Sequence, residues 1–486
     1  MVKTSHSQIL RATSLLGGAG VANILISLIR NKFAAVLLGP SGLGLVGLML
    51  SLIQSASALG GLGIPNAAVR EVAAKQAGGS DEELAKVRWG VTLGTVLAAT
   101  LSGVLLYLCR QPIADHVLEQ PELGSMVGWM APAVALSIIT ASQVALIAGS
   151  GKVSWVAGAG VVGAAISTAL GVAVLLIWGD AAILPYILAT PVGSWLAAHL
   201  FARRLARPRP TTISAAFEQS RWLMLMGAPM MLGTFVTYGS QFAVRAIVSV
   251  EGGIHEVGLF QAALALSTIY VGVLLQSIGS DFYPRLSGVI DDRETAVRLI
   301  NEQTETLLML AGLVVLGLLA LAPFALRLLY ADAFDDAATA LRWLVLGNLV
   351  QIAAWPLGFC LLAAARSKLY LILEIGAAVV TIGSAKLLVP ALGFEGAAIA
   401  TLCGASAYLL AVGITTAWIR RSAWRTKTYV LFLALLGAAA GVFAAAQFDF
   451  WLGTLVGALL TLLWIALVYR ELRFLIFPKR GVEPAS

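Results

Sequence analysis

Apolar segments long enough to cross a lipid bilayer recur from one end of this chain to the other. A membrane-spanning helix needs about 20 mostly apolar residues, and about fourteen segments of the 486-residue sequence meet that requirement. Only 12% of the residues are charged and 59% are hydrophobic, whereas about 25% charged residues is usual in a soluble domain. The sequence therefore predicts an all-α polytopic membrane protein of about 14 transmembrane helices. They run over residues 9–38, 42–66, 88–109, 124–147, 153–178, 182–202, 222–249, 256–280, 299–329, 337–364, 368–389, 394–419, 428–446 and 450–470.

The loops between these segments differ in charge from one side of the predicted membrane to the other. Most Lys and Arg residues fall on the side of the N-terminus, as in the stretch 203–221. Loops on the opposite side are rich in acids. These are Asp115, Glu119, Glu122, Asp332, Asp335 and Asp336. Because cytoplasmic loops carry the excess of Lys and Arg, we expect both termini in the cytoplasm. The same placement accounts for the net charge of +7 without a nucleic-acid partner.

Matching residues suggest that two parts of the chain are distant repeats. Arg30 and Arg245 are 215 positions apart, and so are Arg70 and Arg285. Gly44 and Gly258 repeat at a spacing of 214. Internal repeats are common in transporters, with the substrate site between them. We therefore predict two pseudo-symmetric six-helix lobes, 1–208 and 209–425, around a central cavity. Residues 426–486 are then an extra transmembrane hairpin and a cytoplasmic tail.

Three cations inside apolar segments are the main candidates for binding substrate. They are Arg30, Lys32 and Arg245. A charge in the bilayer is costly unless it faces a polar interior, so these residues indicate a cationic cavity and an anionic cargo. Phosphate suits them, because Arg binds it with two hydrogen bonds and Lys offers a mobile charge. The alternative is that the side chains reach the membrane surface. Arg30 and Lys32 are two positions apart and cannot share one helix face.

Glycines 42, 44 and 47 match the spacing of a dinucleotide-binding loop. That motif needs an acidic residue about twenty positions later, in a strand–helix–strand unit. No acid lies between residues 60 and 67, and the surroundings are apolar helix. We therefore interpret these glycines as points of close helix contact or flexing in the membrane.

The remaining candidates are polar residues within or at the ends of the apolar segments. Tyr238, Gln241 and Trp355 suit a sugar head group, although contacts between helices explain each equally well. Glu374 suits coupling to H⁺ or Na⁺, or a position near the membrane surface. A gate at the inner mouth is one interpretation of Arg70, Asp281 and Arg285; ion pairing at the interface is the other. The three cysteines and four histidines are scattered, so we expect no metal, no other cofactor and no catalytic residue.

Several stretches resemble Wzx-type lipid-linked oligosaccharide flippases, those of O-antigen and enterobacterial common antigen. The resemblance covers about residues 8–421 and rests on the stretches 32–44, 61–66, 256–261, 281–287 and 370–374. It implies the multidrug/oligosaccharidyl-lipid/polysaccharide exporter fold, with two lobes around a V-shaped cavity. It places Lys32 and Glu374 on matching family positions. Many members have twelve spans, so the last two helices depart from the pattern.

The resemblance also implies a function, which is that of a transporter and not of an enzyme. Undecaprenyl-pyrophosphate-linked oligosaccharide would move from the cytoplasmic to the periplasmic leaflet of the bacterial inner membrane by alternating access. Expected partners are this glycan lipid, membrane lipid and a glycan polymerase or chain-length complex. A cation-coupled multidrug or small-molecule exporter is an alternative, but it predicts an acid deep in the first or seventh segment, and neither has one. A membrane glycan polymerase or ligase would need a large external loop, whereas the loops here are short.

Overall fold

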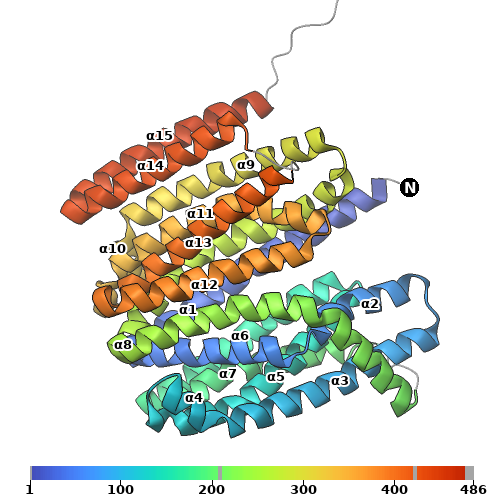
Figure 1. The fold of residues 1–486 in the computed structure, drawn as a ribbon. Helices are drawn as coiled ribbons and strands as arrows, with labels where there is room; N and C mark the ends of the chain where they lie inside the picture. Colours follow the sequence, from blue (N-terminus) through green and yellow to red (C-terminus); the bar gives the residue numbers. More distant parts are fainter. Residues whose placement is uncertain (1–2, 206–210, 420–423, 477–486) are drawn as a thin grey trace, which may run out of the picture. The chain divides into compact units, whose positions relative to one another are not determined.

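The computed structural model describes residues 3–205, 211–419 and 424–476 (Figure 1). Within these ranges all regular structure is helical, which confirms the all-α prediction. Three short 3₁₀ turns connect longer helices: η1 (Pro121–Leu123), η2 (Gly179–Ala182) and η3 (Asp332–Phe334). The α-helices are α1 (Lys3–Gly60), α2 (Ile64–Gly78), α3 (Asp81–Leu108), α4 (Arg110–His116), α5 (Gly124–Gly149), α6 (Val153–Trp178), α7 (Ile183–Ala202), α8 (Ile213–Val289), α9 (Arg293–Ala320), α10 (Ala322–Leu329), α11 (Ala337–Ala363), α12 (Ser367–Leu392), α13 (Phe394–Trp418), α14 (Thr426–Phe448) and α15 (Phe450–Ile476).

Twelve helices in the described part of the chain are long and apolar enough to cross a membrane. Two of them are far longer than one crossing requires. Within the described residues, the candidate membrane-spanning part of α1 covers 43 residues and that of α8 covers 60, whereas about 20 suffice. Each is interrupted by a glycine with non-helical backbone. Counted on either side of these glycines, the helices match the predicted segments, and the chain is a multi-pass membrane protein.

The interruptions in α1 and α8 have the same backbone conformation. Gly39 has φ 62° and ψ −172°, and Gly253 has φ 79° and ψ 173°. This region of backbone space is open essentially to glycine alone. Pro40 follows Gly39 and suits the first position of the helix that restarts there. Both glycines therefore end one span and begin the next, and they lie 214 positions apart.

Beyond these glycines, α1 and α8 cross at a second pair of glycines. A Cβ atom on Gly44 would overlap the carbonyl oxygen of Ile254, and one on Gly258 would overlap the carbonyl oxygen of Pro40. Gly47 likewise leaves room for the side chain of Gln261. Two of the three glycines that imitate a nucleotide-binding loop, Gly44 and Gly47, are therefore points of close helix contact, which confirms that interpretation for them, whereas a Cβ on Gly42 would meet only Leu38 of the same helix.

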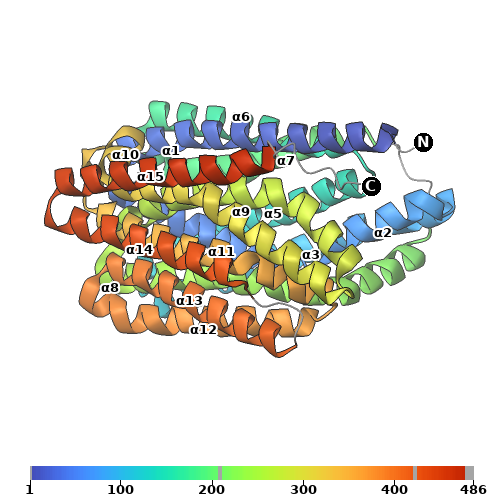
Figure 2. The same cartoon turned by 90° about the horizontal axis from the view of Figure 1, so that it is seen from above.

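The helices gather into two compact units. The first contains Met1–Ala262, Arg327–Asp336 and Glu374–Ala400. In it α6 lies beside both α1 and α7, and α3 lies beside α5 (Figure 2). The second contains Ala263–Leu326, Ala337–Leu373 and Thr401–Ser486. The predicted division into lobes at residues 208 and 425 is a division by sequence repeat, and it stays a prediction.

The C-terminal pair α14 and α15 is firmly attached within the second unit. The two helices lie side by side (Figure 1) and both contact α9. The indole nitrogen of Trp464 donates a 3.0 Å hydrogen bond to the carbonyl of Met309, in space that Gly312 leaves free. Nearby, the hydroxyl of Thr428 donates to Asn301 at 2.7 Å. The extra helix pair predicted from the sequence is thus an integral part of this unit.

Candidate functional site

Arg245 on α8 is a buried cation inside the membrane-spanning region. Its side chain is 6% exposed. The Nε group donates a 3.0 Å hydrogen bond to Oε1 of Gln261, and Nη1 donates a 2.9 Å hydrogen bond to the carbonyl of Gln241. Both partners are neutral, and no acid in the described part of the chain pairs with this guanidinium. Arg245 is therefore held by two hydrogen bonds but not neutralised, a costly state in a low-dielectric interior.

The bond between Arg245 and Gln261 also shows how sharply α8 turns. The two residues lie eight positions before and eight after Gly253. On a straight helix they would be about 24 Å apart, yet their side chains are in hydrogen-bond contact. The chain therefore folds back on itself at Gly253, and the two arms of α8 run side by side there. Gly253 is what brings this pair together.

Arg30 on α1 lies in different surroundings. Its side chain is half-buried, and Nη1 donates a 2.9 Å hydrogen bond to the hydroxyl of Thr190 on α7. The hydroxyl of Tyr186, also on α7, donates to the backbone carbonyl of Arg30 at 3.4 Å. As far as the described residues go, Arg30 too lacks an acidic partner. It is a cation at the boundary between α1 and α7.

Lys32 points away from Arg30, as their spacing of two predicts. It is exposed, and its Nζ donates a 2.8 Å hydrogen bond to the carbonyl of Leu328 in the last turn of α10. Cations are favoured at that end of a helix, where carbonyls lack partners. Next to it, Arg327 makes two 2.8 Å hydrogen bonds to Asp335, and this carboxylate raises the pKa of the guanidinium. Lys32 thus caps the C-terminal end of α10.

The predicted sugar-binding residues fall in both units. Tyr238 is half-buried and Gln241 is exposed, and both belong to the first unit. Trp355 belongs to the second unit. There its ring lies 4.3 Å from that of Phe359 and 6.1 Å from that of Phe282, measured between centroids. These contacts favour the interpretation of Trp355 as a packing residue; a role of the three residues in binding sugar stays a prediction.

The predicted gate and coupling residues lie on three helices, α2, α8 and α12. Arg70 is exposed on α2, and Arg285 is exposed near the end of α8. Asp281 lies outside the residues whose side chains the structure describes. Glu374 is half-buried in the first half of α12. Their roles as gate and as ion-coupling group stay predictions.

Comparison with known proteins assigns the family. Residues 9–289, more than half of the chain, match the family described as "Polysaccharide biosynthesis protein". The chain belongs to this polysaccharide biosynthesis protein family. Two relatives, each named "Lipid III flippase", come from Escherichia coli (strain K12) and Shigella flexneri. Each is 24% identical over 409 residues, which cover 81% of this chain and 95% of the relative.

Solved structures show which fold this family member has. "Lipid II flippase MurJ, inward closed conformation" superposes with a TM-score of 0.75 at 17% identity, covering 94% of this chain and 99% of that one. An inward-facing multidrug resistance MATE family transporter of the MOP superfamily gives a TM-score of 0.65 at 19% identity, covering 85% and 95%. The polysaccharide biosynthesis protein thus has the MOP transporter fold that its sequence predicted.

Residues 256–261 of this family member are one of the stretches that carried the resemblance. Each polar residue and the glycine in this stretch make a defined contact. The carboxylate of Glu256 accepts a 2.9 Å hydrogen bond from the backbone N–H of Phe394, the first residue of α13. Gly258 crosses α1, and Gln261 binds Arg245. The sequence alone did not predict these partners, nor the pairing of Thr190 with Arg30. The one sequence signal for these partners was a polar residue, Gln261 or Thr190, standing alone in an apolar helix.

Proposed function

We propose that this protein moves a lipid-linked oligosaccharide, attached through pyrophosphate, across the bacterial inner membrane from the cytoplasmic to the periplasmic leaflet. Membership of the polysaccharide biosynthesis family, the MOP transporter fold and two relatives named as lipid III flippases support this class of cargo. The observation that carries the proposal is Arg245, a buried cation whose hydrogen-bond partners are all neutral.

Arg245 and Arg30 have the chemistry to bind the pyrophosphate. A guanidinium has five N–H donors, and in Arg245 hydrogen bonds to two neutral oxygens use two of the groups. A phosphate oxygen makes a stronger, charge-assisted bond. The cargo would therefore displace Gln261 from Arg245 and Thr190 from Arg30. Lys32 would add a mobile charge at the edge of the site.

The burial of Arg245 supports a mechanism with at least two states. At 6% exposure its guanidinium is closed to a bulky lipid head group in this conformation. Gly253 and Gly39 hold backbone conformations that only glycine adopts readily, and a Cβ on either would meet no atom within 4 Å. Motion at these two turns would uncover Arg245, as hinges do in alternating-access transporters.

The roles of the remaining candidates rest on the sequence. Tyr238, Gln241 and Trp355 are each proposed to contact the glycan, while the polyprenyl tail stays in the lipid. Arg70, Asp281 and Arg285 are each proposed as gate residues. The resemblance to Wzx-type flippases makes an O-antigen or enterobacterial common antigen precursor the proposed glycan type, whereas the relatives are named only for lipid III. We expect a glycan polymerase or chain-length complex to act on the product.

No ATP-binding motif is recognisable in the sequence, which leaves an ion gradient, a substrate gradient or a partner to drive transport, and we propose the ion gradient. Glu374 is the proposed coupling group for H⁺ or Na⁺. In Glu374→Gln the response of transport to pH and Na⁺ should disappear. A variant that keeps the normal response would remove Glu374 from this role. The cation-coupled exporter is disfavoured, because residues 18–60 of α1 and 219–250 of α8 contain no acid.

The proposal is tested by reconstituting the purified protein in vesicles with a fluorescent lipid-linked oligosaccharide. Arg245→Ala and Arg30→Ala should each slow flipping at least about tenfold, because a hydrogen bond to a charged group contributes about 1.5–3 kcal/mol. Arg298→Gln is the matched control, since it removes an exposed cation paired loosely with Glu302 at 3.9 Å. Undiminished flipping in both alanine variants would refute the cationic site.

The proposed orientation has its own test. With both termini in the cytoplasm, a cysteine placed at residue 119 should react with an impermeant thiol reagent from the periplasmic side. A cysteine placed at residue 203 should not. The reversed pattern would place the termini outside.

A further inference from the structure

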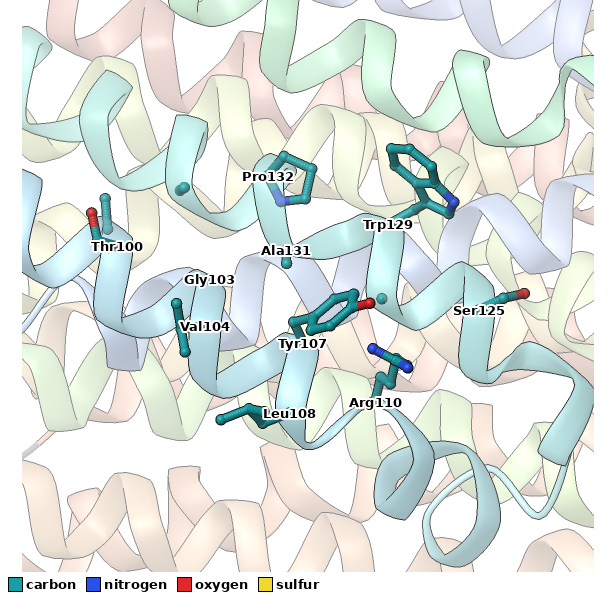
Figure 3. Close-up of a pocket in the computed structure, with 13 residues that line it drawn as sticks. Thr100, Gly103, Val104, Tyr107, Leu108, Arg110, Ser125, Trp129, Ala131 and Pro132 are labelled. Carbon is teal, nitrogen blue, oxygen red and sulfur yellow. The ribbon is translucent and has the colours of Figure 1, made fainter.

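A pocket of about 710 Å³ opens between α3 and α5 in the first unit, apart from the cations discussed above (Figure 3). Small residues on both helices form its floor. Gly103 on α3 approaches the backbone of Ala131 on α5, where a Cβ would lie 3.4 Å from the carbonyl oxygen. Gly128 and Ala135 continue this surface. The volume falls within the range of about 300–1,000 Å³ typical of ligand sites.

The rim of this pocket faces lipid. Val104 is 51% exposed, Leu108 67% and Trp129 57%, and all three line the opening. Large apolar side chains exposed on membrane-spanning helices lie against acyl chains and not against water. The pocket is therefore entered sideways from the bilayer.

A single cation stands at one end of the pocket. The guanidinium of Arg110 lies 4.0 Å from the ring centroid of Tyr107, and the described residues offer it neither an ion pair nor a hydrogen-bond acceptor. Ser125 lies at the same end, whereas Thr100 lies at the other (Figure 3). Among the 13 lining residues Arg110 is the one charged group. Its contact with Tyr107 leaves the N–H donors available.

The length of the pocket matches one leaflet of the bilayer. Along α5 it extends from Ser125 to Ala135, which is about 15 Å of helix. One leaflet is half of a hydrocarbon core about 30 Å thick. Arg110 follows the end of α3 at Leu108 and is the first residue of the short helix α4, which leads to the turn η1. The cation therefore lies at head-group level and the apolar part of the pocket at acyl-chain level.

We propose that this pocket binds a glycerophospholipid of the surrounding bilayer. Its phosphate accepts hydrogen bonds from Arg110 and Ser125, and one acyl chain lies along Gly103 between α3 and α5. One phosphodiester carries one negative charge, which the one cation of the pocket balances. A pyrophosphate-linked glycan carries more negative charge, and the adjoining connection contains Glu119 and Glu122, which would repel it. The site is thus separate from the path of the transported lipid.

The test uses the delipidated full-length protein in detergent, with dioleoylphosphatidylglycerol as the probe and thermal unfolding as the readout. We expect the lipid to raise the unfolding temperature of the wild type. Arg110→Gln should need at least about tenfold more lipid for the same rise, and Arg298→Gln should behave like the wild type. Equal lipid responses in Arg110→Gln and the wild type would overturn the proposal.

Further arms separate the sources of the effect. Dioleoylglycerol, which has no phosphate, should give a much smaller rise than the phospholipid; an equal rise would overturn the role of the phosphate. Inorganic phosphate alone should give none, and a full response to it would mean an adventitious ion only. A stronger Arg110-dependent response to undecaprenyl pyrophosphate than to the phospholipid would assign the pocket to the transported lipid instead.

A second variant keeps the proposal testable should Arg110→Gln fail to fold. Thr100→Trp narrows the far end of the pocket and leaves the cation in place. It should weaken the response to the phospholipid while flipping stays at the wild-type rate. A normal lipid response in Thr100→Trp would contradict an acyl chain between α3 and α5.

Discussion

The helices α1 and α8 share one plan and differ in where they place their cation. Each is interrupted by a glycine, Gly39 or Gly253, and the two cross at Gly44 and Gly258. Arg245, however, is buried and bonded within its own helix, whereas Arg30 is half-buried and bonded to α7. The repeated backbone therefore does not carry a repeated charge site.

A shift of one residue explains the difference. The interrupting glycines are 214 positions apart, and the crossing glycines are too, but the two arginines are 215 apart. One residue turns a helix by about 100°. In the 214-residue register of the glycines, the counterpart of Arg245 is Asn31 and that of Gln261 is Gly47. That register does not pair Arg30 with Arg245, and the repeat itself stays a prediction.

The largest expected effect is on the shared crossing. Gly44→Leu or Gly258→Leu would force a side chain into the backbone of the other helix, so we expect a loss of more than about 3 kcal/mol of stability and little folded protein. Gly272→Leu on α8 is the control, because a Cβ there meets no atom within 4 Å. Folded yield and thermal unfolding in detergent measure both. Wild-type stability of either variant would show that Gly44 and Gly258 are not both required at this crossing.

The next effect separates the two cations. Gln261→Leu leaves the Nε group of buried Arg245 without its acceptor, so it should cost about 1.5–3 kcal/mol in unfolding free energy. Gln241→Leu is the control, because Arg245 bonds to its backbone and not to its side chain. A loss of stability in Gln261→Leu no greater than in the control would mean that the Gln261 hydrogen bond holds Arg245 no more firmly than the Thr190 hydrogen bond holds Arg30.

The interrupting glycines should respond alike. Gly39→Ala and Gly253→Ala meet no steric obstacle, so the cost is that of the backbone alone, about 1–3 kcal/mol each. Unfolding of the two variants under identical conditions measures it. Costs that differ by more than about 2 kcal/mol would show that the two turns are not equivalent.

The smallest effect concerns Arg30. Thr190→Val removes its hydroxyl partner, but the half-buried guanidinium can turn to water, so a loss of only about 0.5–1.5 kcal/mol is expected. The measurement is again thermal unfolding, with Thr237→Val as control, since that hydroxyl bonds to its own helix at Gly233. A loss as large as that of Gln261→Leu would erase the contrast between the two helices.

The sequence predicted the positions of the spans because their length and apolarity are set by the bilayer and need no tertiary information. It also placed a break at Gly39-Pro40, since that pair interrupts a helix on its own. The hydrogen-bond partners of Arg245 and Arg30 could not be predicted from the sequence. Gln261 meets Arg245 only because the chain reverses at Gly253. Glu256 meets the start of α13 across 138 positions, a contact that no local pattern records.

The contact between Trp464 and Gly312 has a consequence for how such proteins change over evolutionary time. The indole of α15 fills the place where any larger residue of α9 would stand, and its N–H is satisfied there. Removing the last two helices would leave a notch in α9 lined by an apolar surface. A bulkier residue at position 312 would displace the indole while the hairpin is present, but it would fill the notch once the hairpin is gone. The same substitution should thus be harmful in the full-length chain and favourable in a chain that lacks the last two helices.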